Sequence, residues 1–443
     1  MKFKYVDNSG KLGLFGALNI MIGSLLGAAI YIMLPDIIEG VGTGMFLAFL
    51  IGSLPAVFSG VYYIQLNATF PNSGGTYYFS KRLLGKYAGF IASSFLMFGV
   101  IGGVAMLANG FSQYFSLYFP GIPVTIPLVG ILLLFIIINI FGIRTVSTLQ
   151  SIMVLIILSA LLIFIVPGLI YGSGVETGNY FLPGGSSALF AASVTAFMSY
   201  GTFVLLSSLG GKIKNPKRNT PLAMGIGIIG VTIIFMGVTI TATMVAPSEM
   251  ISQSSTALVD ISSLYLPEFV SLFIGFSGLL AIATTLNATV TVGATELQIL
   301  AQNKHLPNYI GKNHRKYQTP TNALLFTGLS TLILLVTGLS QEILMHITIV
   351  GILLSVFITG LASLQLPKTE DYKLAMFHFP SWIFYPSIFI GGLLSLGYSV
   401  YIFYAYPIIG ALLIIFLFLM NGLHYFRHLV SNKISVVKSN KEL

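Results

Sequence analysis

The sequence predicts an all-α integral membrane protein with twelve transmembrane helices. Of its 443 residues, 56% are hydrophobic and only 7% are charged, whereas a soluble domain carries about a quarter of its residues as Asp, Glu, Lys and Arg. Apolar runs near 20 residues long, each enough for a helix across roughly 30 Å of hydrocarbon, recur along the chain. Lys and Arg occur near the two chain termini and in every second polar segment between these runs. Together these observations exclude a soluble fold.

The apolar runs divide the chain into two halves and a trailing pair. The predicted spans cover residues 12–34, 41–66, 86–115, 122–141, 147–171, 187–209, 222–246, 268–302, 321–338, 343–366, 382–403 and 405–425. The first run has no small-residue cleavage site, so we expect a retained first helix and not a cleaved signal peptide. We assign residues 1–171 to a first five-helix repeat, 185–366 to a second, 380–425 to the two last helices and 426–443 to a cytoplasmic basic tail.

Positive charge marks one side of the predicted bundle. All 21 Lys and Arg residues lie at the termini or in the loops that follow even-numbered spans. The charged residues of the opposite loops are all acidic, namely Asp36, Glu39, Glu176, Glu249, Asp260, Glu268 and Glu342. Because cytoplasmic loops retain positive residues, we expect a multi-pass protein of the plasma membrane with both termini in the cytoplasm. The net charge of +9 is therefore a topology signal and not a nucleic-acid interface.

Two spans are interrupted by glycine and small polar residues. The first carries Gly23, Ser24 and Gly27, and the sixth carries Ser199 and Gly201. These spans are five apart in order, so they cross the membrane in opposite senses, as corresponding helices of an inverted repeat do. Backbone groups of an unwound segment must face a cavity, because lipid cannot satisfy them. The pattern predicts a ligand site at the two breaks, and the alternative is close helix packing through small residues.

Five motifs occur in the loops and helices where one transporter family carries them. They are Ile22-Gly23 to Gly27, Phe70-Pro71 to Tyr77, Lys214-Asn215-Pro216 to Pro221, Leu286-Asn287-Ala288-Thr289, and His305-Leu306-Pro307 to Leu324. In this order they resemble the amino acid, polyamine and organocation (APC) transporter superfamily, and in particular its amino acid permeases, over nearly the whole chain. The resemblance implies a five-plus-five inverted repeat with broken helices 1 and 6, two C-terminal helices, and secondary active transport by alternating access.

The resemblance also implies where an amino acid would bind. Its carboxylate would face the amides of the first break, and its amine would face carbonyls of both breaks. The implied substrate residues are Ile22, Gly23, Leu26, Gly27, Ala28, Ala29, Phe197, Ser199, Tyr200 and Phe203. The three aromatic residues of the sixth span resemble gating aromatics, and core packing is the alternative interpretation.

The charges inside the spans limit the cargo. No Lys, Arg or Asp lies near the centre of a span, and the one embedded acid, Glu296, is close enough to a span end to snorkel or to pair with Lys304. A cationic cargo would need a buried acid, so we expect a neutral, zwitterionic amino acid, although aromatic rings and carbonyls can also hold cations. Gly99, Gly102 and Gly103 of the third span would either widen a side-chain pocket or serve close packing.

Residues of the eighth span point to a coupling ion. Ala281, Thr284 and Thr285 are spaced so that a carbonyl and two hydroxyls face one another, and hard cations prefer such oxygen ligands. With the carbonyls of Gly23 and Leu26 they resemble the sodium site of distant sodium-coupled relatives. Threonine hydroxyls in helices also bond to their own carbonyls. The fifth span lacks the lysine of some proton-coupled relatives. We expect symport coupled to sodium or to protons, with sodium favoured and with exchange or uniport as alternatives, and no cofactor unless a sodium ion binds here.

Other classes of membrane protein fit the sequence less well. The chain has no cysteine, and its six histidines form no catalytic cluster with paired acids, so we do not expect an enzyme. His346 is the one histidine that lies in a predicted span and not near its end, and there it would serve packing or proton transfer. Amine or organic-cation transport and a non-transporting amino acid sensor are open alternatives. The expected partners are an amino acid and membrane lipid, without nucleic acid, and nothing in the sequence specifies an oligomeric state.

Overall fold

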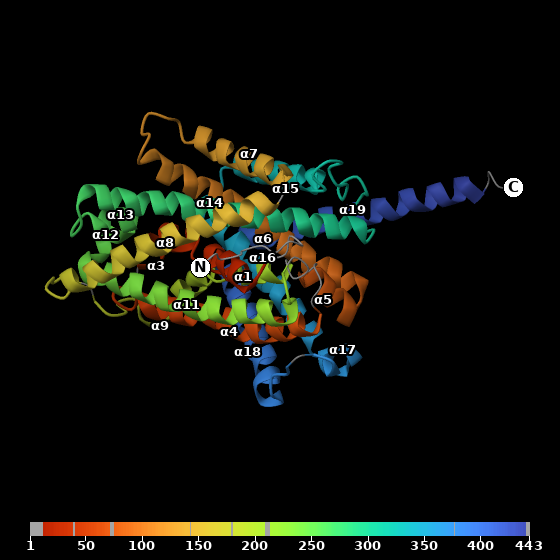
Figure 1. Cartoon of the computed structure of the whole chain (residues 1–443), viewed down its shortest axis with the longest axis horizontal. Helices are drawn as coiled ribbons and strands as arrows, with labels where there is room; N and C mark the ends of the chain where they lie inside the picture. The colour runs from red at the N-terminus through yellow and green to blue at the C-terminus, as the bar shows by residue number, and fades with distance from the viewer. Residues whose placement is uncertain are drawn as a thin grey trace.

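The computed structural model describes residues 12–38, 40–70, 75–141, 143–178, 180–208, 213–375 and 377–439 (Figure 1). Within these ranges the chain contains no β-strand, and its two isolated β-bridges join Leu12 to Ile213 and Gly42 to Phe181. The predicted all-α fold is therefore confirmed. Glu39 and the motif residues 71–74 lie outside the described residues.

Each predicted span contains at least one helix. These helices are α1 (Leu14–Leu25) with α2 (Ala28–Ile32), α4 (Met45–Thr69), α6 (Lys86–Ser116), α7 (Thr125–Phe141), α8 (Ile143–Gly172), α9 (Gly185–Phe197) with α10 (Phe203–Ser208), α11 (Pro216–Val245), α14 (Glu268–Gln302), α15 (Thr321–Val336), α16 (Gln341–Ser363), α18 (Ser381–Ala405) and α19 (Pro407–Ser439). The connections contain α3 (Leu34–Ile38), α5 (Gly75–Leu84), α12 (Ser248–Gln253), α13 (Ala257–Ser262), the 3₁₀ helix η2 (Leu366–Lys368) and α17 (Glu370–Lys373). The main difference from prediction is α19, which continues into the basic tail.

Nine stretches of the described chain are long and apolar enough to cross a membrane. Three more apolar helices, α7, α9 and α15, have only 17, 13 and 16 residues. At about 1.5 Å of rise per residue, these three are at or below the length that spans roughly 30 Å of hydrocarbon. α9 is short because its span is interrupted after Phe197 and resumes as α10. A multi-pass membrane protein is thus confirmed, and the count of twelve spans and the inverted repeat stay predictions.

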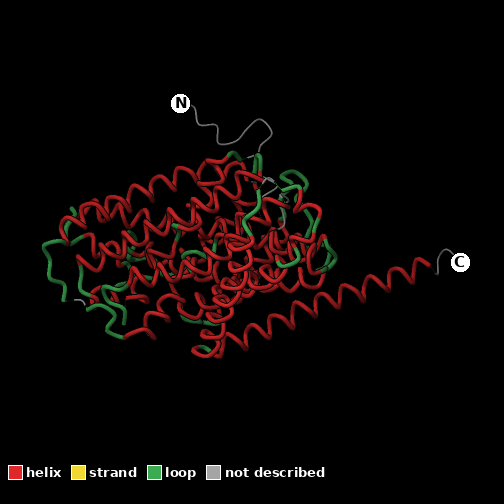
Figure 2. Tube along the Cα trace, turned by 90° about the horizontal axis from the view of Figure 1, so that it is seen from below, coloured by secondary structure: helices red, strands yellow, loops and turns green. Residues whose placement is uncertain are grey.

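Charge separates the two ends of the bundle. In Figure 1, α12 and α13 lie at one end and α5 and α17 lie at the other. The first end, which we call the acidic end, carries Glu249 and Asp260. The second, which we call the basic end, carries Lys81 and Arg82 of α5, and Lys81 Nζ donates to the loop of residues 303–320. α19 runs past the other helices at this basic end (Figure 2).

The backbones of α6 and α16 touch where glycines meet. A Cβ atom added at Gly351 would lie 2.3 Å from the Gly99 amide nitrogen, and one added at Gly99 would lie 2.9 Å from the Thr348 carbonyl oxygen. A Cβ atom at Gly102 would lie 2.5 Å from the Ile347 side chain. Small residues allow helices in a membrane to approach this closely. For Gly99 and Gly102 these contacts favour the close-packing interpretation over a widened pocket.

Gly351→Ala is expected to destabilise the fold, because the added methyl group would overlap the backbone of α6. Overpacking of a tight contact costs about 1–3 kcal/mol. Thermal unfolding of the purified protein in detergent measures the effect as a lower midpoint. Gly230→Ala on α11 is the matched control, since no atom lies within 4 Å of its Cβ position. Equal midpoints for the two variants would contradict the proposed contact.

Candidate functional site

The first span is broken between α1 and α2. α1 ends at Leu25, and the Leu26 N–H donates to the Ile22 carbonyl oxygen at 2.7 Å. Gly27 separates the helices with φ −43° and ψ −146°. A Cβ atom at Gly27 would lie 1.5 Å from Thr285 Oγ1 of α14. This break requires glycine, because a neighbouring side chain occupies the space that a Cβ atom would need.

The second break lies between α9 and α10 and contacts the first. α9 ends at Phe197, α10 begins at Phe203, and residues 198–202 form turns. Thr202 Oγ1 donates to the Ser24 carbonyl oxygen of α1 at 2.9 Å. A backbone carbonyl of one interrupted span thus finds its partner in the other, where lipid could offer none. Thr202 is not among the predicted site residues, although its position between Gly201 and the next helix was the available signal.

Oxygen atoms of α1 and α14 gather at the first break. Thr284 Oγ1 lies 2.8 Å from the Ala281 carbonyl oxygen and 3.5 Å from the Gly23 carbonyl oxygen. Thr285 Oγ1 donates to the same Ala281 carbonyl at 3.1 Å and accepts the Ala28 N–H at 3.3 Å. The geometry brings together four of the five residues predicted to bind sodium. Both hydroxyls bond to their own helix here, as the alternative interpretation expects, so ion binding stays a prediction.

The three aromatic residues predicted as gates are buried and pack on three different helices. The ring pairs are Phe197 with Tyr398 of α18, Tyr200 with Phe235 of α11, and Phe203 with Tyr63 of α4, at centroid distances of 6.4, 5.7 and 5.4 Å. Tyr63 also contacts Phe79 of α5, with ring centroids 6.3 Å apart. Phe203, Tyr63 and Phe79 therefore form a cluster between the second break and the basic end.

The remaining predicted substrate residues are mostly buried at the breaks. Ala28 and Ala29 are buried, and the Ile22 side chain is half-buried. Ser199 is 1% exposed, and its hydroxyl has no hydrogen-bond partner among the described residues. A buried, unsatisfied polar group costs about 1–3 kcal/mol. Ser199 is therefore a group that a bound polar ligand would satisfy.

Glu296 is buried more deeply than the sequence predicted. It is 0% exposed, and its carboxylate accepts a hydrogen bond from Ser93 Oγ of α6 at 2.7 Å. The expectation that it snorkels is wrong, because α6 covers the end of α14 that carries it. Burial and the negative charge of Glu296 raise the pKa of Tyr77 in α5 to about 12. This carboxylate lies about three helical turns beyond Thr285 on α14, toward the basic end.

The histidines also pair in ways that the sequence did not show. His305 Nδ1 and His424 Nδ1 lie 3.3 Å apart, and both rings stack on Phe90 of α6. Because these histidines are 119 residues apart, no local pattern could predict the pair. The ring of His346 is buried and stacks on Tyr406 at 4.5 Å. This contact favours the packing interpretation of His346.

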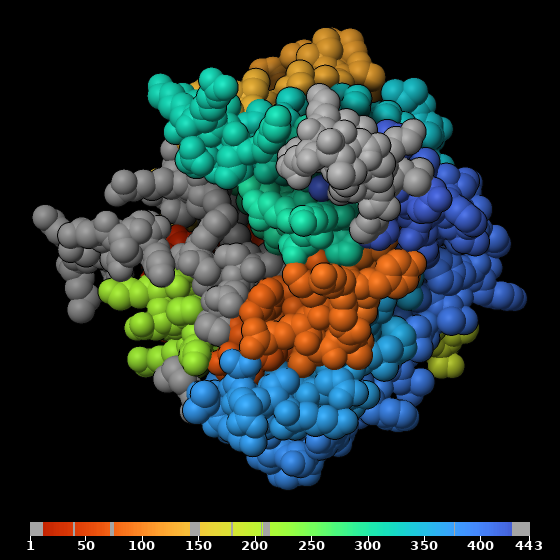
Figure 3. Space-filling view, turned by 90° about the vertical axis from the view of Figure 1, so that its right-hand side faces the viewer, coloured from red at the N-terminus to blue at the C-terminus, as the bar shows by residue number. Residues whose placement is uncertain are grey.

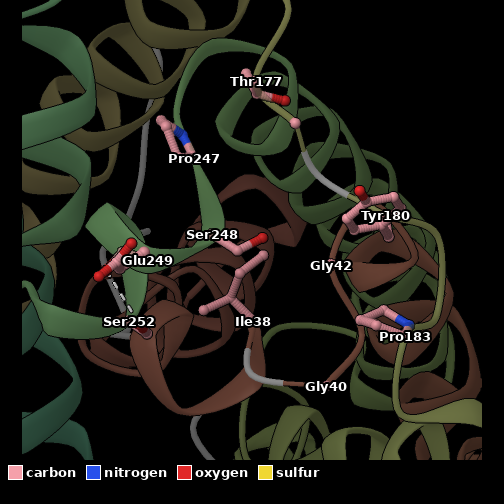
Figure 4. Close-up of a pocket in the computed structure, with 11 residues that line it drawn as sticks. Ile38, Gly40, Gly42, Thr177, Tyr180, Pro183, Pro247, Ser248, Glu249 and Ser252 are labelled. Carbon is pink, nitrogen blue, oxygen red and sulfur yellow. Dashed lines mark hydrogen bonds between the residues drawn. The ribbon is translucent and has the colours of Figure 1, made fainter.

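A separate cavity of about 460 Å³ opens at the acidic end (Figure 4). Its walls come from the connection between α3 and α4, from residues 177–183 and from α12. Gly42 in its wall has φ +51°, and a Cβ atom there would lie 2.0 Å from the Tyr180 carbonyl oxygen. None of the predicted substrate residues lines this cavity. It is therefore distinct from the candidate site at the two breaks.

Comparison with known proteins agrees with this architecture. A family model described as amino acid permease matches residues 12–423. The chain therefore belongs to the amino acid permease family, which is a family of transporters and not of enzymes, and the resemblance to the APC superfamily is confirmed.

Three similar proteins illustrate the range of this family. A methylthioribose transporter of Bacillus subtilis is 22% identical over 87% of this chain and 86% of its own length. A branched-chain amino acid permease of Bacillus subtilis is 24% identical over 72% of each chain. Cationic amino acid transporter 3, mitochondrial, of Arabidopsis thaliana is 23% identical over 71% of this chain and 55% of its own length. The names of these three proteins refer to different solutes, so likeness alone does not select a cargo.

Gly27→Ala is expected to abolish ligand binding at the breaks, because even one methyl group would overlap Thr285. We expect at least a tenfold loss of affinity, or about 1.4 kcal/mol, for labelled neutral amino acids in equilibrium binding. Gly225→Ala on α11 is the control, since its Cβ position is free of contacts within 4 Å. Undiminished binding by a folded Gly27→Ala protein would mean that the ligand binds elsewhere.

Proposed function

We propose that this chain is a secondary active transporter that carries a neutral amino acid across the plasma membrane, together with a sodium ion, by alternating access. The observation that carries the proposal is the meeting of the two broken spans through Thr202 and Ser24. Interrupted helices that meet inside a membrane bundle expose backbone groups to a common site, and transporters of this kind bind substrate there.

The groups at the breaks suit the two charged ends of an amino acid. The first N–H groups of a helix have no intrahelical partner and favour a carboxylate. At α2, Thr285 accepts the Ala28 N–H, which leaves the neighbouring amides of Gly27 and Ala29 as the proposed carboxylate contacts. The buried hydroxyl of Ser199, which has no hydrogen-bond partner among the described residues, supports a polar ligand at the second break. The ammonium group would face the carbonyls of the second break.

The surroundings of the breaks support a neutral side chain on the cargo. No Lys, Arg or Asp lies near the centre of a span, and the buried Glu296 bonds to Ser93 near the basic end. An uncompensated cation at the bilayer centre is costly.

Sodium coupling is supported by the oxygen cluster on α1 and α14. The carbonyls of Gly23 and Ala281 and the hydroxyls of Thr284 and Thr285 are oxygen ligands of the kind that hard cations prefer. The Leu26 carbonyl is the proposed fifth ligand. An ion at this position would lie against the same break as the substrate carboxylate, so each charge would favour binding of the other.

Alternating access requires closures on both sides of the breaks. Toward the basic end, the cluster of Phe203, Tyr63 and Phe79 covers the second break. Toward the acidic end, the Tyr31 hydroxyl of α2 lies 2.8 Å from Ser277 Oγ of α14. We propose that these two contacts separate in turn as substrate enters and leaves. Because positive residues mark the cytoplasmic side, the basic end and both termini are assigned to the cytoplasm, in a fold of twelve spans.

Counterflow in proteoliposomes tests the proposed activity directly. Vesicles are loaded with one unlabelled amino acid, the same labelled compound is added outside, and transient accumulation is followed with and without sodium. We expect accumulation for neutral amino acids that depends on sodium. Accumulation of amines alone would instead identify an organic-cation carrier, and a folded protein that binds amino acids without accumulating them would be a sensor.

Thr284→Ala is expected to raise the sodium concentration for half-maximal uptake at least tenfold, because it removes one of the proposed oxygen ligands. Thr284→Ser keeps the hydroxyl and should behave like the wild type. Thr331→Ala is the control, since this buried hydroxyl bonds only to the Thr327 carbonyl of α15 in the described contacts. Identical sodium dependence in the wild type and in all three variants would exclude the proposed ion site and favour proton coupling or exchange.

A second candidate cargo is a neutral organic solute other than an amino acid. The similarity to a methylthioribose transporter, which extends over 87% of this chain, favours testing it. The same counterflow assay with methylthioribose distinguishes the two cargoes. Accumulation of this compound without any response to amino acids would replace the proposed substrate and retain the transport mechanism.

A further inference from the structure

An apolar groove of about 490 Å³ runs between α15 and α19, with α6 and α16 as its floor. Its walls include Phe326 and Ile333 of α15 and Leu412, Phe416 and Leu423 of α19. This volume lies within the range of ligand pockets in proteins, which is roughly 300–1,000 Å³. The groove therefore has room for a molecule and is more than an irregularity of the surface.

The position of the groove restricts its occupant to an apolar chain. Both of its walls belong to predicted spans, and Ile333 and Leu419 on its rim are 63% and 64% exposed. From Leu412 to Leu423 the α19 wall rises about 16 Å, at roughly 1.5 Å per residue. This length is about half of a hydrocarbon core of roughly 30 Å. One acyl chain of one leaflet would fill the groove.

The inner end of the groove is closed by a basic loop. Arg427 Nη2 of α19 donates to Asn308 Oδ1 at 3.1 Å, and Asn322 Nδ2 of α15 donates to the Tyr309 carbonyl oxygen at 2.6 Å. The loop of residues 303–320 thus connects the ends of the two groove walls. Figure 3 views this basic end, with the loop in teal and α19 in blue.

Charge at this end favours an anionic head group. The loop carries Lys304, Lys312, Arg315 and Lys316, and no Asp or Glu occurs within it. Arg427 follows Leu423 by four residues, so it lies on the same face of α19 as the groove lining. Cationic pockets between helices on the cytoplasmic side suit the head groups of anionic lipids.

We propose that this groove is a binding site for an anionic phospholipid of the cytoplasmic leaflet. One acyl chain lies between α15 and α19, and the phosphate pairs with Arg427 at the end of the groove, near the positively charged loop. The lipid would fill the space between α15 and α19, which face each other across the groove. This inference depends on the assignment of the basic end to the cytoplasm and does not depend on the cargo.

Native mass spectrometry of the full-length protein in mild detergent tests the site without a transport assay. Phosphatidylglycerol and phosphatidylcholine with identical acyl chains are titrated separately. We expect the wild type to bind phosphatidylglycerol at least tenfold more tightly. Arg427→Gln should remove this preference, and Arg427→Lys should retain most of it, because the charge pairs with the phosphate.

Ser330→Trp tests the groove itself, because the indole would occupy the space of the acyl chain. We expect it to reduce binding of phosphatidylglycerol at least tenfold, and Leu419→Trp at the rim serves as a second variant if the first is unstable. Ile229→Trp, on a surface of α11 that is 63% exposed, is the matched control and should bind like the wild type. Equal binding of the two lipids by the wild type, or unchanged binding by folded groove variants, would overturn the proposal.

Discussion

The contact between Gly27 and Thr285 is the constraint on which the centre of this molecule depends. A side chain at position 27 has no space, so the chain can leave the helical path at this point with its backbone against α14. The interruption creates polar backbone groups that lipid cannot satisfy. Thr285 accepts one of them, the Ala28 N–H, so the residue that excludes a side chain also compensates the break.

The second break follows from the same requirement. Once α1 ends, the Ser24 carbonyl oxygen needs a partner, and Thr202 supplies its hydroxyl from the turn between α9 and α10. Around these two breaks the helices pack with little freedom, since the glycines of α6 and α16 place the backbones in contact. α14 contacts both the first break and the closely packed pair of α6 and α16. Its Thr285 lies at the break, and its Glu296 accepts a hydrogen bond from Ser93 of α6. The two interrupted segments are therefore held in place by the continuous helices α6, α14 and α16.

Hydrophobic runs and glycine positions predicted much of this arrangement, because both act locally. The bilayer sets the length of an apolar run, so most helices begin and end within a few residues of their predicted bounds. Both breaks lie where glycine and small polar residues interrupt the runs. What the sequence could not predict depends on neighbours that are distant along the chain. The glycines of α6 pack against α16, Ser93 donates a hydrogen bond to Glu296, and the ring of His305 contacts that of His424. No periodic pattern in the sequence identifies these partners.

A single side chain at the break gives a physical basis for coupling between an ion and a substrate. Thr285 Oγ1 accepts the Ala28 N–H and donates its one proton to the Ala281 carbonyl, so one lone pair of this oxygen remains for a further partner. An ion held by the Ala281 carbonyl and the hydroxyls would replace the internal bond of α14. That replacement would move the hydroxyl relative to α2, whose amides face the proposed carboxylate. For the proposed transporter, binding at either position would then change the free energy of binding at the other, and thermodynamic linkage would make the effect reciprocal.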